Sequence, residues 1–225
     1  PTYTPSAADI LAGSVTLTLT ATGNSPCSDA ISDMILTIVP AAIADAGLAD
    51  DVCEGSTYTL GGTSASNYSA ISWTTSGTGT LSGGTTLTPS YDPSAADILA
   101  GNVTLTLTAT GNSPCSDATS TMVLTIVPAA IADAGIDADI CEGSTYTLSG
   151  TSASNNTGVS WTSSGTGIFS GGNTLTPTYT PSAADIAAGS VTLTLTATGN
   201  SPCNDAISTM VLTINPSPIT GPINH

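Results

Sequence analysis

The chain contains no lysine or arginine, and its 16 acidic residues leave a formal net charge of −16. Because nucleic-acid binding needs Lys or Arg to neutralise phosphates, this absence excludes nucleic acid as a partner. Attraction to an anionic membrane surface is disfavoured for the same reason. The chain also lacks glutamine, so neither Lys–Asn isopeptide nor Thr–Gln ester cross-links can form. Disulfides are therefore the only covalent cross-links that the chain can form.

Histidine is almost as scarce, since His225 is the only one in the sequence. A Ser-His or Cys-His nucleophile therefore cannot be assembled within the repeats described below. No glycine-rich phosphate loop is followed by a helix. No stretch approaches the roughly 20 apolar residues of a membrane span, and no signal peptide is recognisable. We expect no catalytic residue, no cofactor-binding residue and no direct membrane insertion.

The sequence repeats with a period of 88 residues. The segment PTYTPSAADI at Pro1 returns as PSYDPSAADI at Pro89 and as PTYTPSAADI at Pro177. A period of this length is typical of one domain-sized module copied head to tail. Because the chain begins within a module, we expect it to be a window from a longer protein. The predicted organisation is the last strands of a repeat at 1–40, complete repeats at 41–128 and 129–216, and the start of the next segment at 217–225.

Short strands and tight turns dominate each repeat. Residues 191–197 alternate apolar side chains with threonine, which predicts a half-buried strand. A helical turn is expected over 182–188, after Pro181 and before Gly189. About seven short strands without a long helix predict an antiparallel immunoglobulin-like β-sandwich. A β-solenoid is the main competitor, but it needs repeats of about 20–30 residues, and none is visible. The other expected strands are 138–141, 145–151, 158–163, 174–179 and 207–214, with a polar loop at 152–158.

Large apolar residues recur at equivalent positions and predict the core. Trp73 and Trp161 occupy the strand in which immunoglobulin-like sandwiches bury an indole, so burial is favoured over a sugar-stacking role. Met34, Met122 and Met210 recur in the last strand and are expected to fill the core.

Acidic residues gather near the expected edges of the repeats. Calcium takes six to eight oxygen ligands, and a junction between repeats could supply them. No Asp-x-Asp-x-Asp-Gly loop is present, however, and two of the three positions shift between copies. A solvated acidic rim is therefore favoured, and calcium is the alternative. The candidate ligands are Asp45, Asp50, Asp51, Asp133, Asp137 and Asp139.

The five cysteines have no nearby histidine and form no C-x-x-C pair, which indicates disulfides in an oxidising compartment. One pairing keeps each bond within a repeat, as Cys53–Cys115 and Cys141–Cys203. In a seven-stranded sandwich, however, the turn that holds Cys141 and the hairpin that holds Cys203 lie at opposite ends, over 20 Å apart. A disulfide needs Cα atoms within about 7 Å. We therefore favour Cys53–Cys203 across the junction, which leaves Cys27, Cys115 and Cys141 to partners outside this segment.

Several motifs resemble those of a known family. The run ADAG…CEGSTYTL, a Ser-Trp strand, TPTYTPSAADI, VTLTLTATGNSPC and TMVLTI are similar to the PKD-like repeats of large secreted adhesins of Bacteroidetes-type bacteria. The resemblance spans essentially the whole chain. It implies an all-β chain of tandem immunoglobulin-like (PKD-like) antiparallel β-sandwiches, arranged end to end, on the bacterial cell surface.

The expected function is non-enzymatic. The repeats are interpreted as a stalk or spacer of a long extracellular adhesin or surface filament, stiffened by disulfides. The expected partners are neighbouring repeats of the same chain and other copies in a filament or bundle. The alternative is a ligand-binding repeat for glycan, calcium or ice.

Overall fold

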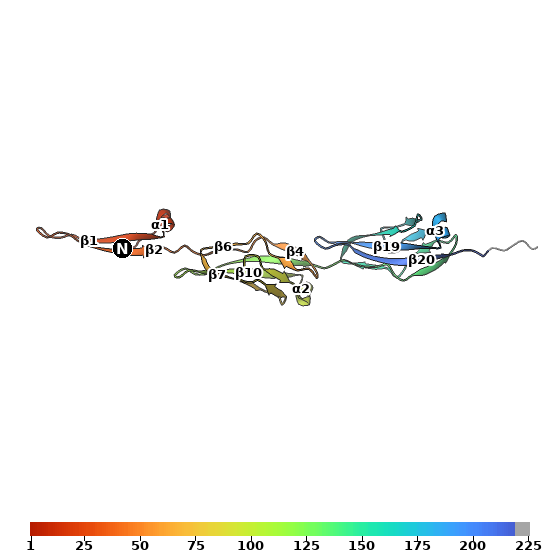
Figure 1. The fold of residues 1–225 in the computed structure, drawn as a ribbon, viewed down its shortest axis with the longest axis horizontal. Helices are drawn as coiled ribbons and strands as arrows, with labels where there is room; N and C mark the ends of the chain where they lie inside the picture. Colours follow the sequence, from red (N-terminus) through yellow and green to blue (C-terminus); the bar gives the residue numbers. More distant parts are fainter. Residues whose placement is uncertain (219–225) are drawn as a thin grey trace, which may run out of the picture. The chain divides into compact units, whose positions relative to one another are not determined.

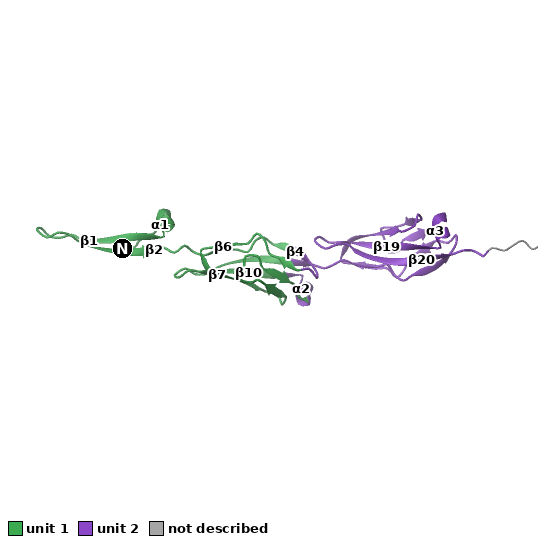
Figure 2. Cartoon of the chain, in the orientation of Figure 1, with its two compact units in different colours: residues 1–50, 57–94, 103–124 green, residues 51–56, 95–102, 125–225 purple. Residues whose placement is uncertain are grey.

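The structure, a computed structural model, describes residues 1–218, so most of the segment expected at 217–225 lies outside the described residues, including His225. The chain divides into two compact units (Figure 2). The first contains residues 1–50, 57–94 and 103–124, and the second contains 51–56, 95–102 and 125–218 of the described chain. The unit boundaries thus do not coincide with the sequence repeats. Within residues 1–218, no helix is both long and apolar enough to cross a membrane.

The repeat at 129–216 is an immunoglobulin-like β-sandwich, as the sequence predicted. Its larger sheet has the order β13-β20-β19-β16, and β19 and β20 run through its centre (Figure 1). β13 pairs with β20 in parallel, whereas β19 pairs antiparallel with β20 and β16. These strands span Ala138–Cys141 (β13), Asn156–Ser163 (β16), Ser190–Gly199 (β19) and Ala206–Asn215 (β20).

Smaller sheets complete this repeat. One has the order β14-β18-β17, and the other pairs β12 with β15. Their strands span Ile131–Asp133 (β12), Tyr146–Thr147 (β14), Ser152–Ser154 (β15), Ile168–Ser170 (β17) and Thr178–Thr180 (β18).

The repeat at 41–128 has the same strand order. Its sheets are β4-β11-β10-β7, β5-β9-β8 and β3-β6. Because the two sequences agree at most positions, the same local preferences produce the same strands twice. The elements span Ile43–Asp45 (β3), Asp50–Cys53 (β4), Tyr58–Thr59 (β5), Ser64–Ser66 (β6), Tyr68–Thr75 (β7), Thr80–Ser82 (β8), Ser90–Asp92 (β9), Ala95–Ala100 (α2), Asn102–Gly111 (β10) and Ala118–Val127 (β11).

The predicted helical turn is present as α3 (Ala183–Ala188). Ser182 caps its N-terminus, because the Ser182 hydroxyl accepts a hydrogen bond from the Asp185 backbone N–H. Gly189 ends it with φ 78°, a left-handed conformation that glycine adopts without steric cost. Both ends of the helix are therefore determined by residues next to it in the sequence.

The core lies between the sheets, as the alternation in the long strands predicts. Val191, Leu193 and Leu195 are buried beside Trp161 and Met210. The Trp161 indole Nε1 donates to the Thr174 carbonyl oxygen at 3.2 Å, which satisfies its only donor. Their equivalents Trp73 and Met122 are also buried.

Met34 does not lie in a core, contrary to the prediction. Its side chain is 56% exposed, on a two-stranded sheet formed by β1 (Ser14–Ala21) and β2 (Ala30–Thr37) after α1 (Ala7–Ala12). The strands that cover Met122 and Met210 have no counterpart among residues 1–40.

Two expected strands are shorter than predicted. Within 145–151 only Tyr146–Thr147 is a strand, and β15 (Ser152–Ser154) forms where a loop was expected. Asn155, with φ 53°, makes the tight turn from β15 into β16. Within 174–179, Thr174 instead closes a turn, because its N–H and its hydroxyl both donate to the Gly171 carbonyl oxygen.

Candidate functional site around the Cys53–Cys203 disulfide

A disulfide joins Cys53, at the end of β4, to Cys203, in the loop between β19 and β20. Their Cα atoms lie 4.9 Å apart, although their sequence separation is 150. Both cysteines belong to the second compact unit. This bond between the 41–128 and 129–216 repeats is the pairing favoured from the sequence.

The alternative pairing within each repeat is wrong. Cys141 lies opposite Asn215 in the β13–β20 register, at the far end of β20 from Cys203. A strand of 10 residues separates the two ends by roughly 34 Å, far beyond the reach of a disulfide. Cys53–Cys115 is excluded because Cys53 bonds Cys203. Among the described residues, Cys27, Cys115 and Cys141 are free thiols.

Glu54 holds the linker 127–129, which leads from β11 to β12. Its backbone N–H donates to the Val127 carbonyl oxygen at 2.8 Å. Its carboxylate oxygen Oε2 accepts from the Ala129 N–H at 3.1 Å. The one residue between them, Pro128, has no N–H to satisfy. Glu54 therefore fastens the linker on both sides of the proline.

Asn155 holds the same linker through the carbonyl group of Ala129. Its side-chain Nδ2 donates to the Ala129 carbonyl oxygen at 3.1 Å. The Asn155 backbone carbonyl in turn accepts from Asn200 Nδ2 at 3.0 Å. Cys203 Sγ lies 3.3 Å from the Val127 carbonyl oxygen, a packing contact because a disulfide sulfur carries no hydrogen. We call Cys53, Glu54, Asn155 and Cys203 the linker clamp.

Parts of the linker clamp recur at the neighbouring linkers. The Glu142 N–H donates to the Asn215 carbonyl oxygen at 2.8 Å, and Glu142 Oε2 accepts from the Ser217 N–H at 3.2 Å. Asn67 Nδ2 donates to the Ala41 carbonyl oxygen at 3.1 Å. The recurrence shows that these contacts belong to the repeat. Sequence reasoning did not single out Glu54 or Asn155, although the CEGS and SASN motifs return in both repeats and could have indicated them.

Asp185 is a buried carboxylate in the repeat at 129–216, at the end of β19 that is away from Cys203. It is 2% exposed, and Oδ2 accepts from Tyr179 Oη at 2.9 Å and from the Ser182 and Gly167 N–H groups at 2.8 Å each. Oδ1 accepts from the Thr166 N–H at 2.9 Å. Burial raises the pKa of Asp185, but the hydrogen bonds outweigh it and lower the pKa to about 2. The carboxylate therefore stays ionised and joins the helix start to a neighbouring loop.

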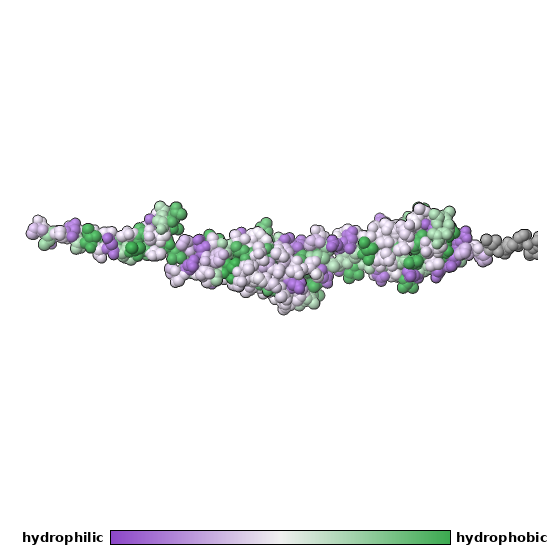
Figure 3. All heavy atoms as spheres, viewed as in Figure 1, coloured by the Kyte–Doolittle hydropathy of each residue, from purple (hydrophilic) through white to green (hydrophobic). Residues whose placement is uncertain are grey.

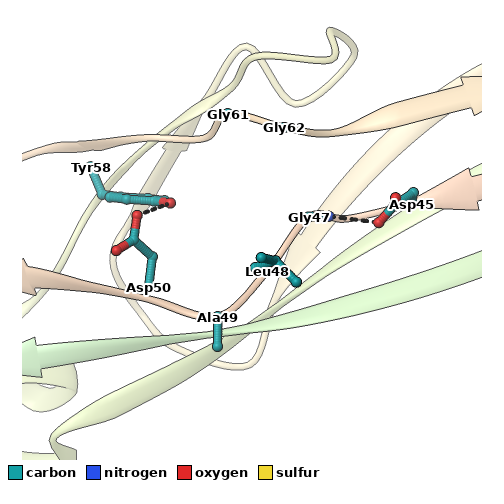
Figure 4. A pocket seen from close by; sticks show the side chains of 8 residues that line it. All are labelled: Asp45, Gly47, Leu48, Ala49, Asp50, Tyr58, Gly61 and Gly62. Carbon is teal, nitrogen blue, oxygen red and sulfur yellow. Dashed lines mark hydrogen bonds between the residues drawn. The ribbon is translucent and has the colours of Figure 1, made fainter.

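A hollow of about 490 Å³ lies in the first unit (Figure 4). Asp50 Oδ2 accepts from Tyr58 Oη at 2.9 Å, and Asp45 Oδ1 accepts from the Gly47 N–H at 3.0 Å. Burial and the Asp50 carboxylate raise the pKa of Tyr58 to about 12. The residues that line the hollow are Asp45, Gly47, Leu48, Ala49, Asp50, Tyr58, Gly61 and Gly62.

Four of the calcium candidates accept hydrogen bonds from other residues of the chain. Besides Asp45 and Asp50, Asp133 Oδ1 accepts from the Gly135 N–H at 2.9 Å, and Asp137 Oδ1 accepts from the Val211 N–H at 2.7 Å. Asp51 lies in β4, and Asp139 lies in β13. Throughout residues 1–218, no three His, Cys, Asp or Glu side chains group as a metal site. Calcium binding stays a prediction that rests on sequence alone.

No family model and no curated protein matches the chain. Among solved structures, it is similar to titin domains I67–I69 (an E-to-A variant) at 16% identity, covering 91% of this chain and 75% of that one, with a TM-score of 0.47. It is also similar to Drosophila N-cadherin EC1-4 at 13% identity, covering 90% and 57%, with a TM-score of 0.44. The protocadherin γB4 extracellular domain matches at 16% identity and a TM-score of 0.41, over 92% of this chain and 40% of that one. The chain thus spans well under two thirds of the protocadherin and N-cadherin structures, and likeness at these scores says nothing about ligands or partners.

Proposed function

We propose that these repeats are a stalk or spacer of a long extracellular bacterial adhesin or surface filament, stiffened by disulfides. The observation that carries this proposal is the Cys53–Cys203 bond between the two complete repeats. Glu54 and Asn155 support it, because they hold Ala129 by its N–H and its carbonyl group. A linker held by hydrogen bonds and a covalent bond has little freedom to hinge.

Force along the chain would bypass most of the protein. When tension is applied at the two ends, the covalent bond transmits it directly between residues 53 and 203. The chain between these two residues, 54–202, then cannot be stretched, whether or not it unfolds. At about 3.3–3.6 Å per extended residue, the bond shortens the fully unfolded chain by roughly 500 Å. This property suits a spacer that must keep its length under load.

The chemistry of the chain supports an extracellular setting. A disulfide persists in oxidising compartments, which favours an extracellular location. The absence of Lys and Arg removes the cleavage sites of trypsin-like proteases. The resemblance of the motifs to PKD-like repeats adds the bacterial surface to the proposal. The buried Asp185 carboxylate is saturated with donors, which suits a structural role rather than proton transfer.

Single-molecule stretching tests the proposal. The chain is pulled from both ends after Cys27, Cys115 and Cys141 are changed to serine, so that only the Cys53–Cys203 bond can form. We expect the oxidised chain to release roughly 500 Å less length on full unfolding than the same chain after reduction. Equal extension in the two states would contradict a force-bearing disulfide. A Cys53→Ser variant, which should stretch fully without reductant, is the control.

A ligand-binding repeat is the second candidate, and the hollow around Asp45, Asp50 and Tyr58 favours it. Its test is a calorimetric calcium titration together with a glycan array. Micromolar binding that is lost in Asp50→Ala would favour a binding role over a spacer. Unchanged binding in Asp50→Ala would exclude this hollow as the binding site.

A further inference from the structure

We propose that the hydrogen bonds of the linker clamp, together with Asn200, select Cys53 and Cys203 as the pair that oxidises. These hydrogen bonds form in the reduced chain and hold the two thiols side by side. Glu54, Asn155 and Asn200 are therefore positioning residues for the disulfide. The proposal goes beyond the spacer function, because it concerns how one bond is chosen among five cysteines and does not depend on force.

Cys203 is placed by its own loop between β19 and β20. Its backbone N–H donates to the Asn200 carbonyl oxygen at 2.7 Å, and the Gly199 N–H donates to Asp205 Oδ1 at 2.9 Å. Asn200 Nδ2 donates to the Asn155 carbonyl oxygen at 3.0 Å. The loop that carries the sulfur is thus fastened to the residue that holds the linker.

Cys53 is placed by the turn that follows β4. The Ser56 N–H donates to the Cys53 carbonyl oxygen at 3.0 Å, and the Glu54 N–H donates to the Val127 carbonyl oxygen at 2.8 Å. The same Val127 carbonyl oxygen lies 3.3 Å from Cys203 Sγ. One carbonyl group of the linker therefore contacts both the residue next to Cys53 and the sulfur of Cys203.

These contacts form a closed ring in which the disulfide is only one link. Glu54 Oε2 accepts from the Ala129 N–H, the Ala129 carbonyl oxygen accepts from Asn155 Nδ2, and the Asn155 carbonyl oxygen accepts from Asn200 Nδ2. All of these residues belong to the second compact unit. With the S–S bond removed, the ring still connects the turn after β4 to the loop between β19 and β20.

The same loop geometry forms around a thiol that carries no disulfide. Cys115 is free, yet its Sγ lies 3.2 Å from the Val39 carbonyl oxygen, as near as Cys203 Sγ lies to its own linker carbonyl. The Cys115 N–H donates to the Asn112 carbonyl oxygen at 2.8 Å, and Asn112 Nδ2 donates to the Asn67 carbonyl oxygen at 3.0 Å. The loop therefore places the sulfur without the help of a disulfide.

The other half of the clamp also forms beside a free thiol. Cys141 is free, and the next residue, Glu142, makes hydrogen bonds to Asn215 and Ser217 that are equivalent to those of Glu54. Each half of the clamp thus belongs to the repeat and is not a result of oxidation. Contacts that exist without the covalent bond raise the effective concentration of one thiol at the other before the bond forms.

Apolar burial does not offer the same selectivity, because the hydrophobic effect is non-directional. Figure 3 shows hydrophobic residues scattered among hydrophilic ones on the visible surface of both complete repeats. Cys53 is only partly buried, and Cys27 and Cys141 are exposed. Directional hydrogen bonds are therefore what distinguishes the Cys53–Cys203 pair from the other thiols.

Oxidation of the pair is a two-electron exchange with a low-molecular-weight disulfide such as glutathione disulfide. One cysteine thiolate attacks it and releases a glutathione thiolate, and the second cysteine then attacks the mixed disulfide and releases the other. The chain loses two electrons and two protons, and two glutathione thiols are formed. Only the second step needs both cysteines together, so the equilibrium constant measures their effective concentration.

Redox equilibrium with glutathione is the direct test. The full chain is used after Cys27, Cys115 and Cys141 are changed to serine, so that only the Cys53–Cys203 bond can form. Its oxidised fraction is measured over a series of ratios of glutathione to glutathione disulfide, which gives the equilibrium constant for this bond.

Removing both side chains of the clamp should lower that constant. In Glu54→Ala combined with Asn155→Gly, we expect a fall of at least about tenfold, because a charged and a neutral hydrogen bond are lost. Glycine is used because Asn155 has φ 53°, which alanine adopts only with strain. Glu54→Gln keeps an acceptor oxygen and should lower the constant less. Glu142→Ala is the matched control, since it removes the equivalent contact to Ser217 and should leave the constant unchanged.

The chain with all five cysteines tests the selection itself. It is refolded from urea in a glutathione buffer, and its disulfides are mapped by pepsin digestion and mass spectrometry. We expect Cys53–Cys203 to predominate in the wild type. Bonds that include Cys27, Cys115 or Cys141 should increase in the double variant.

An unchanged equilibrium constant in the double variant would refute the proposal. An equal fall in Glu142→Ala would also overturn it, because the effect would then be general destabilisation. If the double variant does not fold, Asn200→Ala allows the same measurement with only the side-chain bond to the Asn155 carbonyl removed. A constant equal to that of the wild type in Asn200→Ala would then refute the positioning role.

Discussion

Cys53 and Cys203 lie within 4.9 Å of each other at Cα, and the next residue after Cys53 fastens the linker between their repeats. The covalent bond and the Glu54 hydrogen bonds thus act at one place. The hydrogen-bond contacts recur one period later at Glu142, whereas Cys141, the equivalent of Cys53, is a free thiol. The following predictions test the separate parts of this arrangement.

Loss of the disulfide should destabilise the second compact unit. Replacing both Cys53 and Cys203 by serine is expected to lower the free energy of unfolding by about 2–5 kcal/mol, because the bond closes a long loop in the unfolded chain. Urea denaturation without reductant measures this difference. Cys27→Ser is the control, since Cys27 is an exposed free thiol, and its stability should match that of the wild type. Equal stability of the double variant would mean that the bond constrains geometry without stabilising the fold.

Glu54→Ala should release the linker locally. The Ala129 N–H loses a charged acceptor at 3.1 Å, which is expected to cost about 1–3 kcal/mol. Hydrogen exchange of the Ala129 amide, measured by NMR, should become faster. Glu142→Ala is the matched control, because it acts on Ser217 and should leave the Ala129 amide unchanged. An unaffected Ala129 exchange rate in Glu54→Ala would show that the Glu54 carboxylate does not hold the linker.

Acid should destabilise the repeat at 129–216 through Asp185. Its pKa is about 2 in the folded chain, below the ordinary 3.8, so the ionised form favours folding. This contribution is complete above about pH 4 and is lost as the pH falls toward 2. In Asp185→Asn, the free energy of unfolding should therefore be lower at pH 6 and should depend less on pH between 4 and 2. Denaturation curves at several pH values measure this, and parallel pH profiles for variant and wild type would contradict it.

Gly165→Ala should disturb the same carboxylate. A Cβ added at Gly165 would lie 2.0 Å from Asp185 Oδ1, so the buried carboxylate must move away from its donors. We expect a loss of about 2 kcal/mol or more in the free energy of unfolding. Gly158→Ala is the control, since nothing lies within 4 Å of a Cβ there, and it should be neutral or slightly stabilising. If Gly165→Ala were as stable as Gly158→Ala, the close packing of the Asp185 carboxylate against Gly165 would be contradicted.

The disulfide pairing could be predicted from the sequence, but the hydrogen bonds around it could not. The position of Cys203 in a hairpin and of Cys53 after a short strand follows from local turn and strand signals. Glu54 and Ala129, by contrast, are 75 residues apart and share no spacing that predicts contact. Only the shared CEGS motif marked Glu54 as a repeated residue.

Met34 shows that a repeated position is buried only where the rest of its repeat is present. Its sequence context agrees with those of Met122 and Met210, and only those two are buried. Burial depends on strands supplied by residues far along the chain, which a local pattern does not contain.

The sequence by itself determined the period, the alternating strands, the helical turn at 183–188 and the buried indoles, because alternation, caps and turn residues act over a few neighbouring positions. Tertiary structure alone decided which donors saturate Asp185 and how Glu54 and Asn155 hold Ala129. These features arise where segments distant in the sequence meet, and their geometry is set by the packing of the sheets rather than by residue spacing.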